Sequence, residues 1–424
     1  MKFIAGAVLM SLASAAAAQS VNLTGGGATL PQLAYTADNT AALTTPLPGS
    51  MIGAYSDISG NTTTYCPTGS GTGKKILAGN DPANNVNNAC LGTPAGFGGT
   101  GLTQPAFVGS DSPLASSDMT AYFAGHTALG AQPVQFPSIA GAIAVSFNKA
   151  GVSQLNLTET QVCQVFSGQI KTWQALRASG ANTGIPSSTT GNITVVYRSD
   201  GSGTSFNFSN HLSAVCGAAA GGLNVPGAGS FQTNQDFSQA IASYLPSGYA
   251  ATATASGNTG VVTKVGSVDG AIGYAEVANV VVSSPALYAS IENKNATGTF
   301  IDPSSFGPSN VAVSLQFDKA IGGNDANGRP QLVALSGLPK SQCIAVVDPS
   351  AYASPAAGYP IMAVTYLLGN ATGNGSLTAG VRGVLGSPYS TDVRNATGTV
   401  GFAGTGFAWL DSGVTQSAVD SCVN

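Results

Sequence analysis

One stretch near the middle of the chain, Arg198–Ser205, concentrates residue types that bind anions. Its eight residues include one arginine, four hydroxyl side chains and two glycines. Arginine presents a planar fork of N–H donors that matches a tetrahedral oxyanion. Glycines allow the backbone N–H groups to approach the ligand closely. These residues predict a site for a phosphate-like ligand, although a polar turn that caps a helix has the same composition.

The segments on either side of this stretch indicate how it is positioned. Ile193–Tyr197 is β-branched and aromatic, which predicts a strand. Phe208, Leu212 and Val215 follow at the spacing of an amphipathic helix. The stretch therefore joins the end of a strand to the start of a helix, where free backbone N–H groups attract anions.

Four other glycine-containing segments have a similar character: Gly25–Pro31, Gly69–Gly73, Phe107–Leu114 and Gly270–Glu276. The first three fit loops at the carboxyl ends of strands, where open α/β sheets bind their ligands. The fourth is a glycine-rich strand. Each of the three loops, taken alone, is better explained as an ordinary Gly/Ser turn.

The second of these loops is not a nucleotide-binding P-loop, although Lys74 follows its last glycine. The pattern G-x-x-x-x-G-K-[ST] requires glycine at position 68 and Ser or Thr at position 75. The chain has Thr68 and Lys75 there.

The N-terminus, Met1–Ala18, has one positive charge, a short apolar run and an Ala-x-Ala site, which predicts a secretory signal peptide. No later segment predicts a membrane span, so we expect no stable membrane insertion. The remaining chain of about 400 residues is too long for one core and predicts two domains.

Charged residues make up only 8% of the chain, and the net charge is −4. This composition argues against a nucleic-acid partner, which calls for basic patches. His126 and His211 are the only histidines, and no CxxC pair occurs, so we expect no metal and no cofactor. Six cysteines in an exported protein predict three disulfides.

Local patterns predict further helices at Glu159–Gly168 and Asp236–Leu245. Ser284–Pro308 and Leu367–Ser387 are rich in Gly, Asn and Ser, which predicts loops.

Six segments, in chain order, resemble motifs of the PstS-type phosphate-binding proteins of ABC transporters and of the related DING proteins. They are GGGATLPQ at 25–32, GSG at 69–71, SDSPL at 110–114, FSGQIKTW at 166–173, RSDGSGTS at 198–205 and GAIGYAE at 270–276. The loop at 198–205 is the most specific match. Similarity extends from about Thr24 to about Glu276 and is weaker at Tyr359–Ile361.

The resemblance implies an α/β protein with the two-domain type II periplasmic-binding-protein fold and a ligand cleft between the domains. Domain I would comprise 19–141 plus 281–424, and domain II would comprise 142–280. The crossings between them would lie near Ala142 and Val280.

The resemblance also implies a set of phosphate ligands: Thr29, Leu30, Ser70, Asp111, Arg198, Ser202, Gly203 and Thr204. Leu30 and Gly203 would contribute backbone N–H groups, and Asp200 would brace the Arg198 guanidinium. Leu30 replaces the Phe of most PstS proteins, which matters little for a backbone contact. An ionised Asp111 accepts hydrogen bonds but cannot donate them, so it favours a ligand that carries a proton. We therefore expect phosphate, and also arsenate, rather than sulfate.

With this domain division, we pair Cys163 with Cys216 in domain II. Cys66 and Cys90 flank the second loop and form another pair. Cys343 and Cys422 remain for the third.

The function implied by the resemblance is phosphate binding without catalysis. The protein would be a monomer that either serves an ABC permease in the periplasm or acts as a secreted phosphate scavenger. Two alternatives are a secreted phosphomonoesterase that uses Asp111 or Ser202, and a surface or matrix protein that merely keeps the fold. The sequence has no G-x-S-x-G motif and no histidine beside a Ser or Cys motif, which argues against the enzyme.

Overall fold

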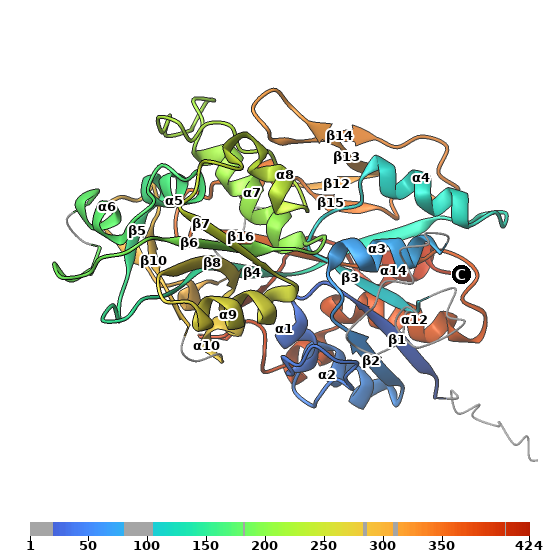
Figure 1. Cartoon of the computed structure of the whole chain (residues 1–424). Coiled ribbons are helices and arrows are strands. Elements are labelled where there is room, and N and C mark those ends of the chain that lie inside the picture. Colours follow the sequence, from blue (N-terminus) through green and yellow to red (C-terminus); the bar gives the residue numbers. More distant parts are fainter. Residues whose placement is uncertain (1–19, 80–104, 181–182, 283–285, 308–312, 403) are drawn as a thin grey trace, which may run out of the picture.

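The computed structural model describes residues 20–79, 105–180, 183–282, 286–307, 313–402 and 404–424, and its principal feature is one curled sheet (Figure 1). The strands follow the order β2 (Thr62–Cys66), β1 (Asn22–Gly27), β3 (Phe107–Ser110), β16 (Met362–Asn370), β4 (Pro133–Asn148), β8 (Ala271–Glu276), β6 (Thr194–Arg198) and β7 (Ala251–Ala255). Two short strands, β9 (Leu287–Tyr288) and β17 (Phe407–Trp409), also pair with β4.

Each end of this sheet is parallel. β2, β1 and β3 run in one direction at one end, and β8, β6 and β7 do so at the other. The carboxyl ends of parallel strands share one edge of a sheet, where ligand loops gather. The predicted loops after β1, β2 and β3 therefore open together, and the 198–205 loop after β6 opens beside the loop after β7.

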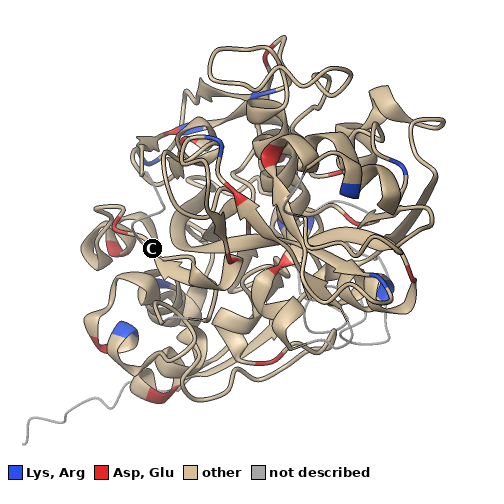
Figure 2. Ribbon diagram, turned by 90° about the vertical axis from the view of Figure 1, so that its left-hand side faces the viewer, with Lys and Arg blue, Asp and Glu red and all other residues tan. Residues whose placement is uncertain are grey.

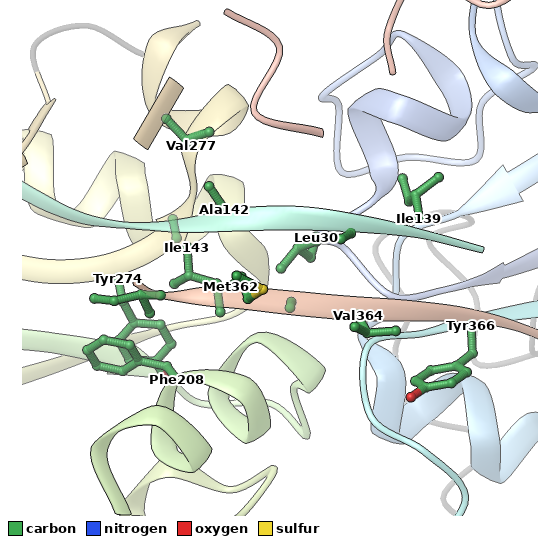
Figure 3. Packing of buried hydrophobic residues seen from close by; sticks show 14 of the residues in the cluster. Leu30, Ile139, Ala142, Ile143, Phe208, Tyr274, Val277, Met362, Val364 and Tyr366 are labelled. Carbon is green, nitrogen blue, oxygen red and sulfur yellow. The ribbon is translucent and has the colours of Figure 1, made fainter. Parts of the chain in front are cut away.

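The antiparallel strands β4 and β16 connect the two parallel groups. β4 is buried through 15 of its 16 residues and is largely apolar, as expected for a strand covered on both faces. It pairs with β16 as far as Ala142 and with β8 from Ile143 onward. Figure 3 shows this crossing, with Phe208 and Tyr274 packed at one end and Tyr366 at the other.

The change of partner falls at the predicted crossing near Ala142. After β8 the chain first stays beside the second parallel group, because β9 pairs with β4 at Ser146–Phe147. Likewise β10 (Ser290–Glu292) pairs with β5 (Asn156–Thr158) and with β11 (Phe300–Ile301). The division into 19–141 plus 281–424 and 142–280 remains a prediction.

Helices cover both faces of the sheet, with α7 and α9 on opposite sides of β8 (Figure 1). The helices are α1 (Gln32–Thr36), α2 (Met51–Ser59), α3 (Ser70–Ala78), α4 (Ser116–Gly125), α5 (Glu159–Phe166), α6 (Trp173–Ala178), α7 (Gly203–Val215), α8 (Phe237–Ala240), α9 (Gly257–Ser267), α10 (Val277–Val281), α11 (Pro349–Tyr352), α12 (Thr378–Gly386), α13 (Thr391–Ala396) and α14 (Gln416–Cys422). The predicted apolar stripe of α7, Phe208, Leu212 and Val215, is fully buried.

A hairpin in the C-terminal part, β13 (Lys319–Asn324) and β14 (Pro330–Ala334), contacts both halves of the molecule. It follows β12 (Leu315–Phe317), which pairs with β15 (Ala345–Val347). The Ile321 N–H donates to Leu114 O (3.0 Å), at the last residue of the SDSPL segment. Asn324 Nδ2 donates to Thr233 O (3.0 Å) in the other half. Figure 1 shows the hairpin extending between α4 and α7.

Several local predictions need correction. Leu367–Ser387 is not a loop, because β16 continues to Asn370 and α12 occupies Thr378–Gly386, where Val381, Val384 and Leu385 are buried at helical spacing. Its glycines obscured that spacing. Ser284–Pro308 contains β9, β10, β11 and a 3-10 turn at Pro303–Ser305 in addition to loop. The predicted helix at 236–245 divides into α8 and a 3-10 turn at Ala242–Tyr244.

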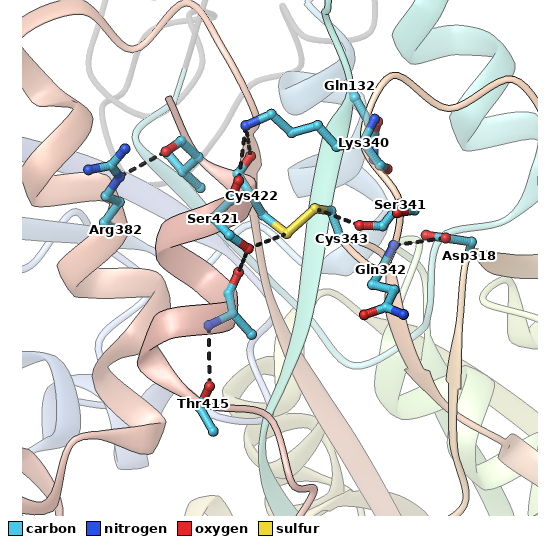
Figure 4. The surroundings of a disulfide bond; sticks show 12 residues. Gln132, Asp318, Lys340, Ser341, Gln342, Cys343, Arg382, Thr415, Ser421 and Cys422 are labelled. Carbon is cyan, nitrogen blue, oxygen red and sulfur yellow. Dashed lines mark hydrogen bonds between the residues drawn. A yellow bond between two sulfur atoms is a disulfide. The ribbon is translucent and has the colours of Figure 1, made fainter.

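Two disulfides have the predicted pairing, Cys163–Cys216 and Cys343–Cys422. The first joins α5 to the residue after α7. The second ties α14 to the segment before β15, where Lys340 Nζ also donates to Cys422 O (3.1 Å; Figure 4). Cys66 is also disulfide-bonded, and its predicted partner Cys90 lies outside the described residues, as does the predicted signal peptide.

Charged residues are scattered thinly over the ribbon (Figure 2). Among the helices of the described ranges, none combines the length and apolar character needed to cross a membrane.

Candidate anion-binding site

The predicted ligand residues come together from both parallel groups. Thr29 and Leu30 follow β1, Ser70 opens α3, and Asp111 follows β3. Across from them, Arg198 ends β6, and Ser202 caps α7, accepting a hydrogen bond from the Ser205 N–H (3.1 Å). At most 5% of any of these residues is exposed: Thr29, Leu30, Ser70, Asp111, Arg198, Ser202 and Thr204.

Arg198 is held in place by its own loop. Its Nε donates to Asp200 Oδ1 (2.7 Å), its Nη2 contacts Asp200 Oδ2, and its Nη1 donates to Thr204 Oγ1 (3.4 Å). Asp200 also accepts the Gly257 N–H (3.1 Å). Burial acts to raise the pKa of Asp200, but the charge of Arg198 and these hydrogen bonds outweigh it and lower that pKa. The predicted bracing role of Asp200 thus matches the geometry.

Asp111 is buried, with 1% of it exposed. Its N–H donates to Ser70 Oγ (3.0 Å), and Ser70 Oγ donates to Asp111 Oδ2 (3.4 Å). Its other oxygen, Oδ1, is buried and has no hydrogen-bond partner among the residues that the structure describes. Burial raises the pKa of Asp111 to about 7, against the opposing effects of Arg198 and Ser70. Asp111 is therefore a buried acceptor with unused capacity.

The two sets of loops touch directly. The Gly71 N–H donates to Gly201 O (2.9 Å), and Asn207 Nδ2 donates to Asp111 O (2.5 Å). Gly203 must be glycine here, because a Cβ atom would lie 2.4 Å from Asp111 Cβ and 2.6 Å from Ser70 Oγ. The two sets of loops therefore approach each other too closely at Gly203 to admit a larger residue at that position.

Asn258, at the start of α9, was absent from the sequence prediction. Its Nδ2 donates to both Thr29 Oγ1 and Thr204 Oγ1 at 3.3 Å, so it connects predicted ligands from the two sides. The signal was available, since Ser256–Gly260 is another polar, glycine-containing segment, and it forms the start of α9 directly after β7. The preceding strand, Ala-Thr-Ala-Thr-Ala, is too small and too exposed to stand out.

A cleft of about 620 Å³ adjoins the site and reaches it at Thr29, Asp200 and Asn258. Lys264 lies on its wall. Within the described residues, no three His, Cys, Asp or Glu side chains are grouped so as to hold a metal ion.

Comparison with known proteins places this geometry in a family. Residues 13–369 match the family model of the PBP superfamily domain. The chain belongs to the PBP superfamily. The predicted resemblance to PstS-type and DING-type proteins is confirmed.

Among curated relatives, alkaline phosphatase L of Pseudomonas aeruginosa is 28% identical over 401 residues, which cover 92% of this chain and 86% of that protein. The phosphate-binding protein PstS of Xylella fastidiosa is 31% identical over 224 residues, or 52% of this chain and 53% of that protein.

Solved structures of this superfamily have the same fold. The high-affinity periplasmic phosphate-binding protein PfluDING, solved with phosphate, superposes with a TM-score of 0.61 and 24% identity, covering 92% of this chain and 91% of that one. The phosphate-binding protein of Stenotrophomonas maltophilia gives a TM-score of 0.59 at 24% identity, over 95% and 93% of the two chains. The predicted α/β fold of the type II periplasmic-binding-protein class is confirmed.

Proposed function

We propose that this protein binds inorganic phosphate between its two sets of loops, through the ligands Thr29, Leu30, Ser70, Asp111, Arg198, Ser202, Gly203 and Thr204. The observation that carries the proposal is the pairing of a buried, braced Arg198 with a buried Asp111, one oxygen of which has no partner in the described part of the chain. The names of PstS and DING relatives support the same ligand.

The pairing of these two side chains defines what the ligand must offer. Arg198 and the hydroxyl groups donate hydrogen bonds, so the ligand must accept them. Asp111 in its ionised form accepts, so the ligand must also donate. Phosphate near neutral pH carries an O–H group and meets both demands. Sulfate carries none and would leave a buried charge unmatched, which costs more than a single hydrogen bond contributes.

Titration calorimetry of the phosphate-stripped protein tests this proposal. We expect tight phosphate binding and sulfate binding weaker by at least a factor of about 100, from a mismatch of roughly 3 kcal/mol. Asp111→Asn should reduce the ratio of phosphate affinity to sulfate affinity, mainly by strengthening sulfate binding, because an amide can donate a hydrogen bond. Equal affinities of the wild type for the two anions would refute the proposal.

The same chemistry extends to arsenate, which shares the shape and protons of phosphate. From the resemblance to PstS-type and DING-type proteins, we propose that the exported protein delivers phosphate to an ABC permease or scavenges it in the periplasm or outside the cell; the name of the periplasmic phosphate-binding protein PfluDING supports the periplasmic location. We expect a monomeric binding protein.

A second candidate, phosphomonoester hydrolysis, is favoured by the relatives named alkaline phosphatase L. The site argues for binding, because Ser202 Oγ serves as a helix cap and His211 pairs elsewhere, with Glu159 (3.2 Å). Assay with p-nitrophenyl phosphate, with and without divalent metals, separates the two. We expect no turnover above background. Turnover that Asp111→Asn or Ser202→Ala abolishes would establish the enzyme instead.

A further inference from the structure

The hydroxyl groups of Thr29 and Thr204 share an uncommon arrangement. Thr29 Oγ1 accepts two N–H groups, the backbone N–H of Asn258 (3.3 Å) and Asn258 Nδ2 (3.3 Å). Thr204 Oγ1 also accepts two, from Asn258 Nδ2 (3.3 Å) and from Arg198 Nη1 (3.4 Å). Asn258 thus donates to both hydroxyl groups.

A hydroxyl oxygen has two lone pairs and one proton. When two N–H donors occupy the lone pairs, the proton must point elsewhere. Within the part of the chain that the structure describes, neither hydroxyl donates to a protein acceptor. Each therefore has one proton available for a ligand rich in acceptor oxygens.

We propose that Asn258 is a positioning residue that makes Thr29 and Thr204 hydrogen-bond donors toward the bound anion. This inference rests on the proposed phosphate-binding function and adds a determinant outside the predicted ligand set. Because Thr29 follows β1 and Thr204 lies on α7, one amide group orients donors from both sides of the site. Asn258 is 1% exposed, so water does not replace this interaction.

The orientation of the amide decides this role. If Oδ1 occupied the place of Nδ2, it would accept the threonine protons and withdraw both from the ligand. Aspartate at this position reproduces that state, because an ionised carboxylate only accepts. Asn258→Asp should therefore weaken phosphate binding more than Asn258→Ala does. Protonation of the new carboxyl group restores a donor. The loss of phosphate affinity in Asn258→Asp relative to wild type should therefore become smaller as the pH falls from 8 to 5.5.

The test is calorimetry with inorganic phosphate on Asn258→Ala, Asn258→Asp, Thr204→Val and the double variant Asn258→Ala/Thr204→Val. We expect Asn258→Ala to weaken binding about tenfold. In the Thr204→Val background the same change should weaken it about threefold or less, because one of the two hydroxyls it orients is already absent. Asn293→Ala is the matched control, since Asn293 is equally buried and its Nδ2 also donates to two oxygens, far from the site.

Three outcomes would overturn the inference: wild-type affinity in Asn258→Ala, wild-type affinity in Asn258→Asp at pH 8, or fully additive effects in the double variant. Additive effects would indicate that Asn258 only stabilises α9, and an equal loss in Asn293→Ala would indicate general destabilisation. If the wild type itself binds no phosphate, the proposed function has failed instead.

Discussion

At the scale of single residues, the site combines a fixed cation with a carboxyl group whose charge state depends on its surroundings. Arg198 is braced by Asp200, and Asp111 is buried with a pKa raised to about 7. In the proposed function, the first group supplies affinity for any anion, and the second selects for protons on that anion. Two predictions test these roles separately.

Replacing Arg198 with lysine keeps the charge but removes the planar fork. We expect Arg198→Lys to weaken phosphate binding at least tenfold, about 1.4 kcal/mol, and Arg198→Ala to weaken it further. The alanine variant also leaves Asp200 without its cation, so repulsion adds to the loss. Calorimetry measures both, and near-wild-type affinity in Arg198→Ala would remove this residue from the site.

Asp111 should make the ligand-free protein less stable at high pH. Its pKa in the folded protein, about 7, exceeds the ordinary 3.8, so the native state retains a proton that the unfolded chain has released. The stabilisation is complete below about pH 4 and is lost as pH rises through 7. Asp111→Asn abolishes this titration, so its melting temperature relative to wild type should rise between pH 5 and pH 8.

The control for that experiment is Asp57→Asn, which removes a carboxylate at an exposed position. If the melting temperatures of Asp111→Asn and wild type differed by the same amount at pH 5 and pH 8, the result would contradict the raised pKa of Asp111.

At the scale of elements, the β13–β14 hairpin contacts segments adjacent to both sets of ligand loops. Ile321 bonds to Leu114, three residues beyond Asp111. Asn324 and Gly328 bond to Thr233, and Gln235 O nearby accepts the Ser202 N–H (3.0 Å). In the proposed opening of the cleft, the hairpin must therefore detach from one side.

Asn324→Ala removes the side-chain bond to Thr233 and should speed phosphate release about threefold, since a net hydrogen bond contributes roughly 0.5–1.5 kcal/mol. Stopped-flow dissociation measures this rate. Asn327→Ala, at the tip of the hairpin, is the control, because the bond recorded there uses its backbone N–H. Equal rates in wild type and Asn324→Ala would show that the hairpin does not restrain opening.

At the scale of the whole molecule, the closed arrangement depends on glycine at the contact between the two sides. A Cβ atom on Gly203 would clash with Asp111 and Ser70, so Gly203→Ala should hold the cleft open without disturbing either half. A ligand that contacts both sides favours the closed state by its differential contacts.

Small-angle scattering should thus show a smaller radius of gyration for the wild type with phosphate than without it. Gly203→Ala should stay at the larger value and lose phosphate binding. Gly217→Ala, where the nearest atom to the new Cβ would be 3.5 Å away, should behave as wild type. A phosphate-induced contraction in Gly203→Ala would contradict this account of closure.

Local sequence alone determined the elements that carry the proposed ligand residues. Arg198–Ser205 lies between β6 and α7 because β-branched residues precede it and an apolar helical stripe follows, and both preferences act over a few neighbouring residues. The disulfide pairs Cys163–Cys216 and Cys343–Cys422 were also predicted, once the family resemblance divided the chain. The sequence did not predict α12, because glycines, which have a weak helix preference, interrupt the spacing of its apolar residues.

Only the tertiary structure decided the properties that depend on burial and on distant partners. The raised pKa of Asp111 follows from its removal from water by loops of both halves. Asn258 meets Thr29 across 229 positions of sequence, and Asn324 meets Thr233 across 91. No local pattern encodes such contacts, because they exist only when separate strands and helices are brought to the same edge of the sheet. The sequence therefore indicates which residue types could bind an anion. The orientation of these side chains, their charge states and the closed arrangement of the loops are consequences of the fold.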